Sequence, residues 1–307
     1  MQHSERSGLL LALIGFATLS VGDAVIKSMA DAWPALPVAA LRFTLGAGAL
    51  ALIMWKAEGA ASMVPDRPWL QLGRGLCVAI ASLAFFSAIY IMPLAETMAI
   101  AFLAPVITAI LSGPILGEKV KRAVWIAWFI AMVGVALILR PNLALLGWSA
   151  FLPLLSAFFF GLMIVLNRMA AGRGSALAMQ FYLAGVAAPV LVVAAIIARY
   201  FEIGSLDFGW PSWDVAARCA LVAVTATTAH WLVYLGTTRA GASQIAPCTY
   251  IQMLVATLLG WWWFGDVPDH MTILGAAIII GAGLFLWRAS SGDQSARKAV
   301  SEPASTG

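Results

Sequence analysis

The sequence predicts an all-α polytopic membrane protein with ten transmembrane helices, arranged as two inverted five-helix repeats. Three observations lead to this fold class. First, 62% of the 307 residues are hydrophobic and only 10% are charged, whereas soluble proteins carry roughly 25% charged residues. Second, apolar stretches of about 20 residues, long enough to cross a bilayer, recur along the chain. Third, one segment is repeated after about half the length of the chain.

The repeated segment runs from Ala95 to Lys119 and is apolar almost throughout. An offset of 147 residues aligns Ala95 with Ala242. After a slip of one residue, Gly117-Glu118 near the end of the first copy aligns with Gly265-Asp266 in the second. Self-similarity at a fixed spacing indicates that one structural unit is used twice.

Ten spans can be placed in order, and several of the connections between them are little more than a turn. A signal peptide is an alternative for the first span, but its apolar region is too long and contains Asp23 and Lys27. The spans lie at residues 8–30, 36–56, 69–91, 95–116, 121–139, 147–169, 177–199, 212–236, 242–264 and 270–288. We expect one repeat over 8–140, a second over 147–288, and a disordered cytoplasmic tail over 289–307.

Lysine and arginine are unevenly distributed over the predicted loops, and this bias sets the orientation. With the N-terminus in the cytoplasm, the outer loops hold only Arg140 and Arg199 beside several acidic residues. The inner loops hold Arg6, Lys56, Arg67, Lys119, Lys121, Arg122, Arg168, Arg173, Arg239, Arg288, Arg297 and Lys298. We therefore expect both termini in the cytoplasm. Tryptophans near the span ends, Trp287 among them, are typical of an interfacial belt.

Five spans in each half have a topological consequence. An odd number of crossings makes the second half enter the membrane from the opposite side. The halves are then inverted repeats, related by an axis in the membrane plane, and carriers that work by alternating access use this architecture.

The sequence contains none of the common motifs of an enzyme. It has no His-Glu-x-x-His, no Gly-x-Ser-x-Gly and no phosphate-binding glycine loop. A net charge of +4 without a basic stripe gives no sign of a nucleic-acid partner. The three cysteines all lie in apolar runs, which argues against a disulfide framework. We therefore expect no enzymatic activity, no cofactor and no bound metal.

Particular residues give the chain a resemblance to a known family. In the first half these are Gly22 and Lys27, the pair Arg42-Phe43, Pro105, and Gly117-Glu118. In the second half, Gly161, Ala242 and Gly265-Asp266 recur, but Met253 stands where the proline would be and Phe181 where Arg42 has its counterpart. Over residues 8–288 the chain resembles the ten-helix EamA-type branch of the drug/metabolite transporter superfamily.

Within that superfamily the chain is most similar to bacterial exporters of aromatic and other neutral amino acids, some of which also pass organic cations such as paraquat. The resemblance implies a multi-pass protein of the bacterial inner membrane. Its partners would be small solutes and the lipid bilayer. It would act as an exporter or uniporter, by alternating access around a central cavity.

Charged residues within the spans are the first candidates for function, because charge exposed to lipid costs several kcal/mol. Asp23 and Lys27 are four residues apart and share a helix face, so we expect them to pair, with Arg42 at similar depth. They form either an outer gate, a contact for the charges of a zwitterion, or a structural ion pair between the first two helices. We expect Arg74, near a helix end, to extend toward the interface.

His230 is the one histidine within a predicted span, and Tyr234 lies on its helix face. We interpret both as cavity lining, with a satisfied packing histidine as the alternative. Near the midplane, aromatic, methionine and amide side chains suit a mostly apolar zwitterionic solute. These further candidates are Ser82, Met98, Phe102, Pro105, Phe158, Met163, Asn167, Tyr250 and Gln252.

The sequence thus favours a secondary transporter of small neutral solutes, with aromatic and other neutral amino acids as the expected cargo. A rival within transport is a proton-coupled antiporter of drugs or organic cations, which needs a mid-membrane acid such as Asp23. A rival from another class is a membrane-embedded enzyme or a structural subunit.

The orientation gives a testable prediction. In a variant without the three native cysteines, we expect Ser62→Cys and Ser290→Cys to be shielded from an impermeant thiol reagent in intact cells, because both positions lie on the positively charged inner side. Ser205→Cys should be labelled. Labelling of position 62 or 290 from outside would reverse the orientation.

Overall fold

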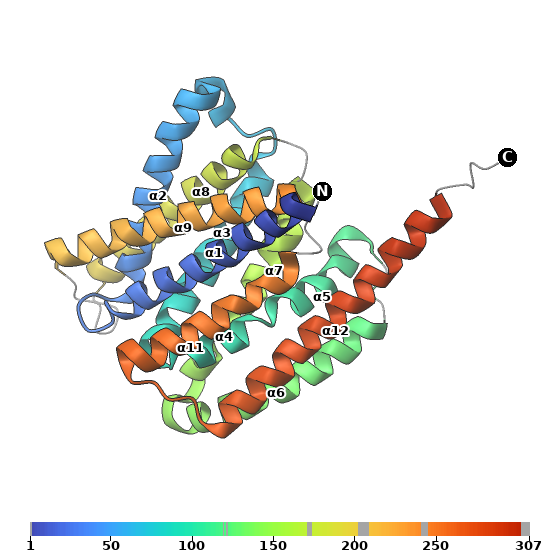
Figure 1. Cartoon of the computed structure of the whole chain (residues 1–307). Coiled ribbons are helices and arrows are strands. Elements are labelled where there is room, and N and C mark those ends of the chain that lie inside the picture. Colours follow the sequence, from blue (N-terminus) through green and yellow to red (C-terminus); the bar gives the residue numbers. More distant parts are fainter. Residues whose placement is uncertain are drawn as a thin grey trace.

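The computed structural model is a bundle of helices joined by short turns (Figure 1). It describes residues 2–118, 120, 122–170, 174–201, 209–240 and 245–301, and within these ranges there is no strand. The elements are α1 Gln2–Lys27, α2 Ala35–Glu58, η1 Ala60–Met63, α3 Pro68–Ile91, α4 Leu94–Ala101, α5 Ala104–Leu116, α6 Arg122–Leu146, η2 Gly147–Phe151, α7 Leu152–Ala170, α8 Ala176–Tyr200, α9 Trp213–Ala240, η3 Ala246–Tyr250, α11 Ile251–Phe264 and α12 His270–Ser301.

Nine segments in the described part of the chain are long and apolar enough to cross a membrane. They correspond to nine of the ten predicted spans, so the all-helical membrane fold is confirmed. The remaining predicted span, 242–264, contains η3 and the 14-residue helix α11, and residues 241–244 lie outside the described ranges. Helices dominate because the bilayer core offers no water to a backbone N–H or C=O group.

The fourth span is broken, where the sequence predicted one helix with a proline inside it. α4 ends at Ala101, and α5 begins at Ala104 after a turn at Phe102 and Leu103. Pro105 lies in the first turn of α5, where a proline is tolerated because its missing N–H has no intrahelical partner there. In the second half the corresponding span also changes geometry, from the 3-10 turn η3 to α11 at Tyr250.

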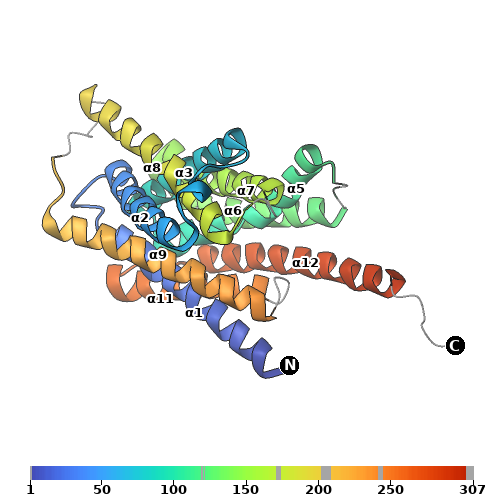
Figure 2. The same cartoon turned by 90° about the horizontal axis from the view of Figure 1, so that it is seen from above.

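The two halves pack on each other through helix contacts that occur twice, once with each half in each role. α1 packs on α9, and α7 packs on α3, so the first helix of each half lies against the third helix of the other. In the same way α5 packs on α7, and α11 packs on α1. Equivalent helices also pack on each other, α2 on α8 and α6 on α12, the last pair forming one side of the bundle (Figures 1 and 2).

The start of α1 and the end of α12 lie on the same side of the bundle, as an even number of crossings requires (Figure 1). Which side faces the cytoplasm stays a prediction, and Ser205 of the labelling test lies outside the described residues. α12 continues as a helix to Ser301, past residue 289, where the disordered tail was expected to begin. Residues 302–307 of that tail lie outside the described ranges.

Candidate functional site

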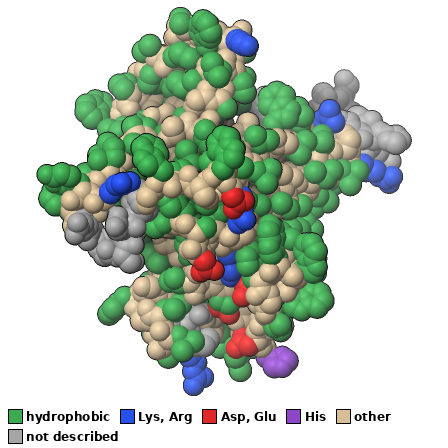
Figure 3. Space-filling view, turned by 90° about the vertical axis from the view of Figure 1, so that its left-hand side faces the viewer, with side chains coloured by type: hydrophobic (Ala, Val, Ile, Leu, Met, Phe, Trp, Pro, Cys, Tyr) green, Lys and Arg blue, Asp and Glu red, His purple; other side chains and the backbone are tan. Residues whose placement is uncertain are grey.

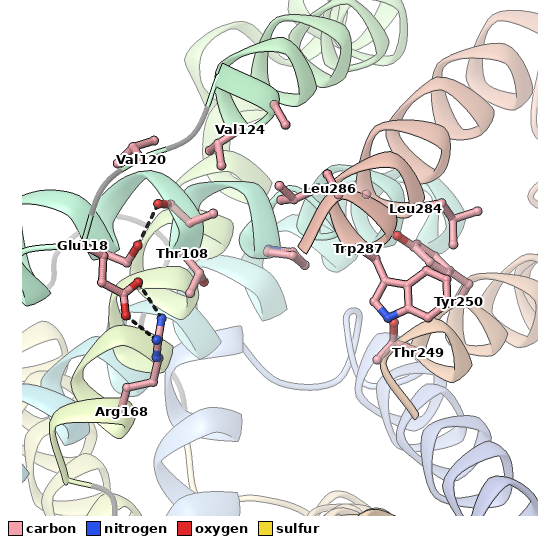
Figure 4. Close-up of a pocket in the computed structure, with 16 residues that line it drawn as sticks. Thr108, Glu118, Val120, Val124, Arg168, Thr249, Tyr250, Leu284, Leu286 and Trp287 are labelled. Atoms are coloured by element: carbon pink, nitrogen blue, oxygen red, sulfur yellow. Dashed lines mark hydrogen bonds and ion pairs between the residues drawn. The ribbon is translucent and has the colours of Figure 1, made fainter. Parts of the chain in front are cut away.

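A cavity of about 380 Å³ lies between helices of both halves (Figure 4). Its volume is within the range of roughly 300–1,000 Å³ that small-molecule sites occupy. The wall is mostly apolar, with a few hydroxyl groups and one ion pair. The lining residues are Pro105, Thr108, Ala109, Ser112, Glu118, Val120, Ala123, Val124, Arg168, Thr249, Tyr250, Gly283, Leu284, Leu286, Trp287 and Ala289.

Two aromatic rings meet where the broken fourth and ninth spans approach each other. The ring centroids of Phe102 and Tyr250 are 5.4 Å apart and the planes are tilted by 45°, within the range of favourable aromatic pairs. The two residues are separated by the offset that aligns Gly117 with Gly265, so the contact joins equivalent positions of the two copies. Phe102 supports the ring of Tyr250, which forms part of the cavity wall.

The Tyr250 side chain lies directly against helix α12. A Cβ atom on Gly283 would collide with the Tyr250 hydroxyl group, so only glycine leaves room for the ring at this position. The indole of Trp287, one turn further along α12, lines the same cavity (Figure 4). Trp287 was expected in the interfacial belt. Its position in the sequence gave no sign that the side chain points into the cavity.

The broken spans end in the same way. Gly117 follows α5 with φ 71° and Gly265 follows α11 with φ 69°, a left-handed conformation that glycine adopts without strain. The N–H groups of Gly117 and Glu118 donate to the carbonyls of Gly113 and Ser112. The N–H groups of Gly265 and Asp266 donate to those of Trp261 and Gly260. Each cap therefore places an acidic residue at the same point just beyond a helix end.

Each of these acids forms an ion pair with a first helix. Beside the cavity, Glu118 accepts two hydrogen bonds from the Arg168 guanidinium, at 2.5 and 3.2 Å. The two side chains are 42% and 51% exposed. In the other copy, Asp266 pairs with Lys27 at 2.6 Å, and these side chains are only 23% and 11% exposed. The Lys27 ammonium also donates to the Met92 carbonyl and lies 5.1 Å from the centre of the Phe264 ring.

The two ion pairs lie at opposite ends of the bundle. Lys27 bonds to Met92 at the C-terminal end of α3. Asn167, next to Arg168 in sequence, bonds to Arg74 near the N-terminal end of the same helix. Arg74 and Met92 are about 27 Å apart along a helix axis at 1.5 Å per residue. Figure 3 shows acidic and basic side chains gathered in the middle of the face on which α1 and α11 end.

The expected Asp23–Lys27 pair does not form. Lys27 reaches across to Asp266, 239 residues away in sequence, although helical spacing places Asp23 one turn from Lys27. Asp23 interacts electrostatically with Arg42 instead. The Arg42 guanidinium lies over two aromatic rings, 4.6 Å from the centre of Phe43 and 5.3 Å from that of Phe86.

Pro105 and Tyr250 are the predicted site residues that line the cavity. Met98 and Met163 are buried in the core, at 4% and 6% exposure. Phe158 packs edge-on against Phe159 and is 41% exposed on the outside of α7, where a span meets lipid.

The remaining candidates lie away from the cavity. The His230 ring is exposed, with Nδ1 2.7 Å from the Ala226 carbonyl in the preceding turn. Ser82 is half-buried on α3, and the Gln252 carbonyl accepts a hydrogen bond from the Ser20 hydroxyl at 2.7 Å. The Tyr234 side chain lies outside the described residues.

Arg74 was expected to extend to the interface, but it is buried, with 3% exposed. Its guanidinium donates to the side-chain oxygen of Asn167 at 2.6 Å, to that of Gln71, and to the Met179 sulfur at 3.3 Å. Asn167, a predicted cavity residue, therefore forms a hydrogen bond that joins α7 to α3. The sequence contained one signal for this cluster, because Gln71 and Arg74 are spaced to share a helix face.

A metal centre is not formed by the described side chains, which contain no group of three His, Cys, Asp or Glu residues suited to hold an ion. The polar groups of the cavity are instead hydroxyls and the Glu118–Arg168 pair, and the Lys27–Asp266 pair lies at the opposite end of the bundle. Such an arrangement can bind a solute and can open or close at either end.

Comparison with known proteins identifies the chain's relatives. The model of the EamA-like transporter family matches residues 6–140 and again 147–288. The pseudopaline exporter CntI of Pseudomonas aeruginosa is 29% identical, over 94% of this chain and 98% of its own length. A riboflavin transporter of Rhizobium johnstonii is 26% identical, over 91% and 89%. An S-adenosylmethionine uptake transporter of Rickettsia prowazekii is 24% identical, over 91% and 92%.

A solved crystal structure shares the fold. It superposes with a TM-score of 0.57 at 18% sequence identity and covers 92% of this chain and 96% of its own. At this identity the likeness supports the architecture alone.

The glycine caps give a prediction about stability. Gly117→Ala and Gly265→Ala should each lower the free energy of unfolding by about 1–2 kcal/mol, because a Cβ disfavours the left-handed conformation. Gly46→Ala is the matched control, since Gly46 lies within α2 in open space, and there alanine should stabilise by about 0.5–1 kcal/mol. Unfolding of the purified proteins in detergent measures both effects. Equal stability of all three variants would contradict the assigned role of the caps.

Proposed function

The chain belongs to the EamA-like transporter family, and from this premise we propose that it exports small solutes that carry an aromatic ring and an amino-acid head group. It is a multi-pass inner-membrane transporter of small molecules and not an enzyme. The cargo we propose is aromatic and other neutral amino acids. The observation that carries this proposal is the ring pair Phe102–Tyr250, with Trp287 beside it in the wall of a cavity that both halves form.

Two of the cargoes named for the relatives are compatible with such a site. Riboflavin contains a fused aromatic ring system, and S-adenosylmethionine combines an adenine ring with an amino-acid head group. A ring that stacks on Tyr250 would suit all of these solutes. Phosphorylated cargo would require several buried Lys or Arg side chains. Among the described residues, the cavity wall contains one basic side chain, Arg168, which is paired with Glu118.

We further propose that the two halves are inverted repeats that open the cavity alternately to the two sides of the membrane. The double family match and the paired helix contacts support this division at residues 8–140 and 147–288. The equivalent ion pairs Glu118–Arg168 and Lys27–Asp266 would then close opposite ends of the pathway. With the predicted orientation, the cavity lies at the cytoplasmic end.

The two gates differ in strength. The Glu118–Arg168 pair is exposed, and pairs of this kind contribute about 0–1 kcal/mol. The Lys27–Asp266 pair is largely buried, and removing one partner of a buried pair costs up to about 3–5 kcal/mol. The end near Glu118 should therefore open more readily than the end near Lys27.

A proton-coupled antiporter of organic cations is a second candidate, and one observation favours it. Asp23 is not neutralised by Lys27, so an acidic group within the first span is available to a cation or a proton. Arg42 beside it disfavours a cargo that carries a positive charge without a negative charge to offset it. Stimulation of uptake by an imposed proton gradient would support the antiporter, whereas facilitated exchange without a gradient supports the uniport that we propose.

Counterflow in liposomes tests the cargo. The purified protein should exchange tritiated tryptophan and phenylalanine, and Phe102→Ala and Tyr250→Ala should weaken this exchange several-fold, because a buried aromatic contact is worth about 1 kcal/mol. Threonine exchange should change less. Phe158→Ala, which removes an exposed ring, is the matched control. Equal losses for all amino acids would show that the two rings serve packing only.

Cysteine reporters test the gates. In a cysteine-free background, Leu94→Cys reports on the end near Lys27 and Ser112→Cys on the cavity end, since both positions are buried. Asp266→Asn should raise labelling at position 94 and lower it at position 112, and Glu118→Gln should have the opposite effect. Asp214→Asn, which breaks an exposed pair with Arg218, should change neither. Parallel changes at both reporters would contradict alternating gates.

A further inference from the structure

Asp23 and Arg42 form a pair of opposite charges within the spans that the gates do not use. Both are half-buried. They interact electrostatically, yet in the described part of the chain Asp23 forms no hydrogen bond and no ion pair within 4 Å. An ionised group in a nonpolar interior is costly unless something bonds to it. Two such groups side by side therefore suit a ligand that carries both signs of charge.

The surroundings of Arg42 leave its hydrogen-bonding edge available. The rings of Phe43 and Phe86 lie against the guanidinium at 4.6 and 5.3 Å. Contacts of this kind use the positive charge and need no conventional hydrogen bond from the N–H donors. The five N–H donors point outward in its plane, which is the geometry that binds a carboxylate through two bonds.

Tyr90 adds a donor on α3, the helix whose Phe86 ring lies against Arg42. Phe86 and Tyr90 are four residues apart on α3 and share a helix face. The Tyr90 hydroxyl is buried without a hydrogen-bond partner among the described residues. Phe86 and Cys219 of α9 are buried in one hydrophobic cluster against which Tyr90 packs, and Arg42 lies over Phe86, so the guanidinium and the hydroxyl belong to one region of the bundle.

The spacing along α1 directs Asp23 toward the interior. Ser20, Asp23 and Lys27 follow one another by three and four residues and so lie on one helix face. Ser20 bonds to the Gln252 carbonyl and Lys27 to Asp266, so both neighbours of Asp23 on this face meet the ninth span. Asp23 lies between these two contacts along α1, further into the bundle than the Lys27–Asp266 pair. It is about one helical turn, or about 5 Å, from Ser20, which bonds to Gln252. Gln252 is two residues from Tyr250.

We propose that Asp23 and Arg42 bind the head group of a dipolar solute, such as the ammonium and carboxylate of an amino acid. Arg42, assisted by the Tyr90 hydroxyl, takes the carboxylate, and Asp23 takes the ammonium. The inference rests on the proposed function, because the ring of the same solute would lie toward Tyr250. Each charge of the ligand meets its opposite, so the protein pair and the ligand neutralise one another inside the bundle.

Competition against tritiated phenylalanine counterflow tests the head-group subsite. The competitors are phenylalanine, its amide, which lacks the carboxylate, and its N-acetyl derivative, which lacks the ammonium. The wild-type protein should prefer phenylalanine at least tenfold, or about 1.4 kcal/mol. Arg42→Gln should lose the preference over the amide, and Asp23→Asn the preference over the N-acetyl derivative. Asp214→Asn is the control and should keep both.

Selective losses separate binding from packing. Equal weakening of all three competitors by Arg42→Gln and Asp23→Asn would show a structural ion pair and overturn the subsite. Arg42→Lys and Asp23→Glu keep the charges, and their partial retention of selectivity supports it. A wild-type protein that carries phenylalanine without distinguishing the blocked analogues would leave the transporter proposal standing and refute the subsite.

A probe without a ring makes the test independent of the aromatic cargo. Glycine should raise the melting temperature of the purified protein, while glycinamide and N-acetylglycine should not. Arg42→Gln should abolish the rise. This outcome would support the subsite even where no aromatic amino acid is exchanged. An unchanged melting temperature with glycine at tens of millimolar would refute it.

Discussion

The need to satisfy every backbone polar group inside the bilayer shapes this protein more than any other constraint. Helices meet that need within one segment, so the membrane spans are helical and their connections are short. The exceptions are therefore informative. The fourth span breaks at Phe102, and the ninth changes from a 3-10 turn to α-helix at Tyr250, where the two halves meet and neither backbone faces lipid alone.

The broken spans also end alike. Each short helix beyond a break, α5 and α11, stops at a left-handed glycine that is followed by an acid. The acid then reaches a basic residue on the first helix of the other half. One local design thus yields two ion pairs about a helix length apart, and in the proposed mechanism their different burial makes the two ends of the pathway unequal. Unequal ends give a carrier a preferred resting conformation.

The sequence was most informative where function depends on local pattern. Apolar length predicted the membrane fold, although the fourth span, expected as one helix containing Pro105, is broken just before that proline. The repeated Gly-Glu and Gly-Asp pairs marked equivalent positions of the two copies, and the structure shows that both glycines cap a helix in the left-handed conformation. The same residues led to the family, which the match over both halves confirms. Cargo could not be derived in this way, and the relatives are named for several different solutes.

Partners between helices were decided by the tertiary structure alone. Helical spacing assigned Lys27 to Asp23, but packing brought Asp266 to it from the far end of the chain. Arg74 was expected at the interface and lies buried against Asn167, and Trp287 was expected in the belt and lines the cavity. A sequence fixes which residues share a face of one helix, through 3.6 residues per turn. The rotation of that helix against its neighbours depends on the whole packed bundle, and no local pattern contains it.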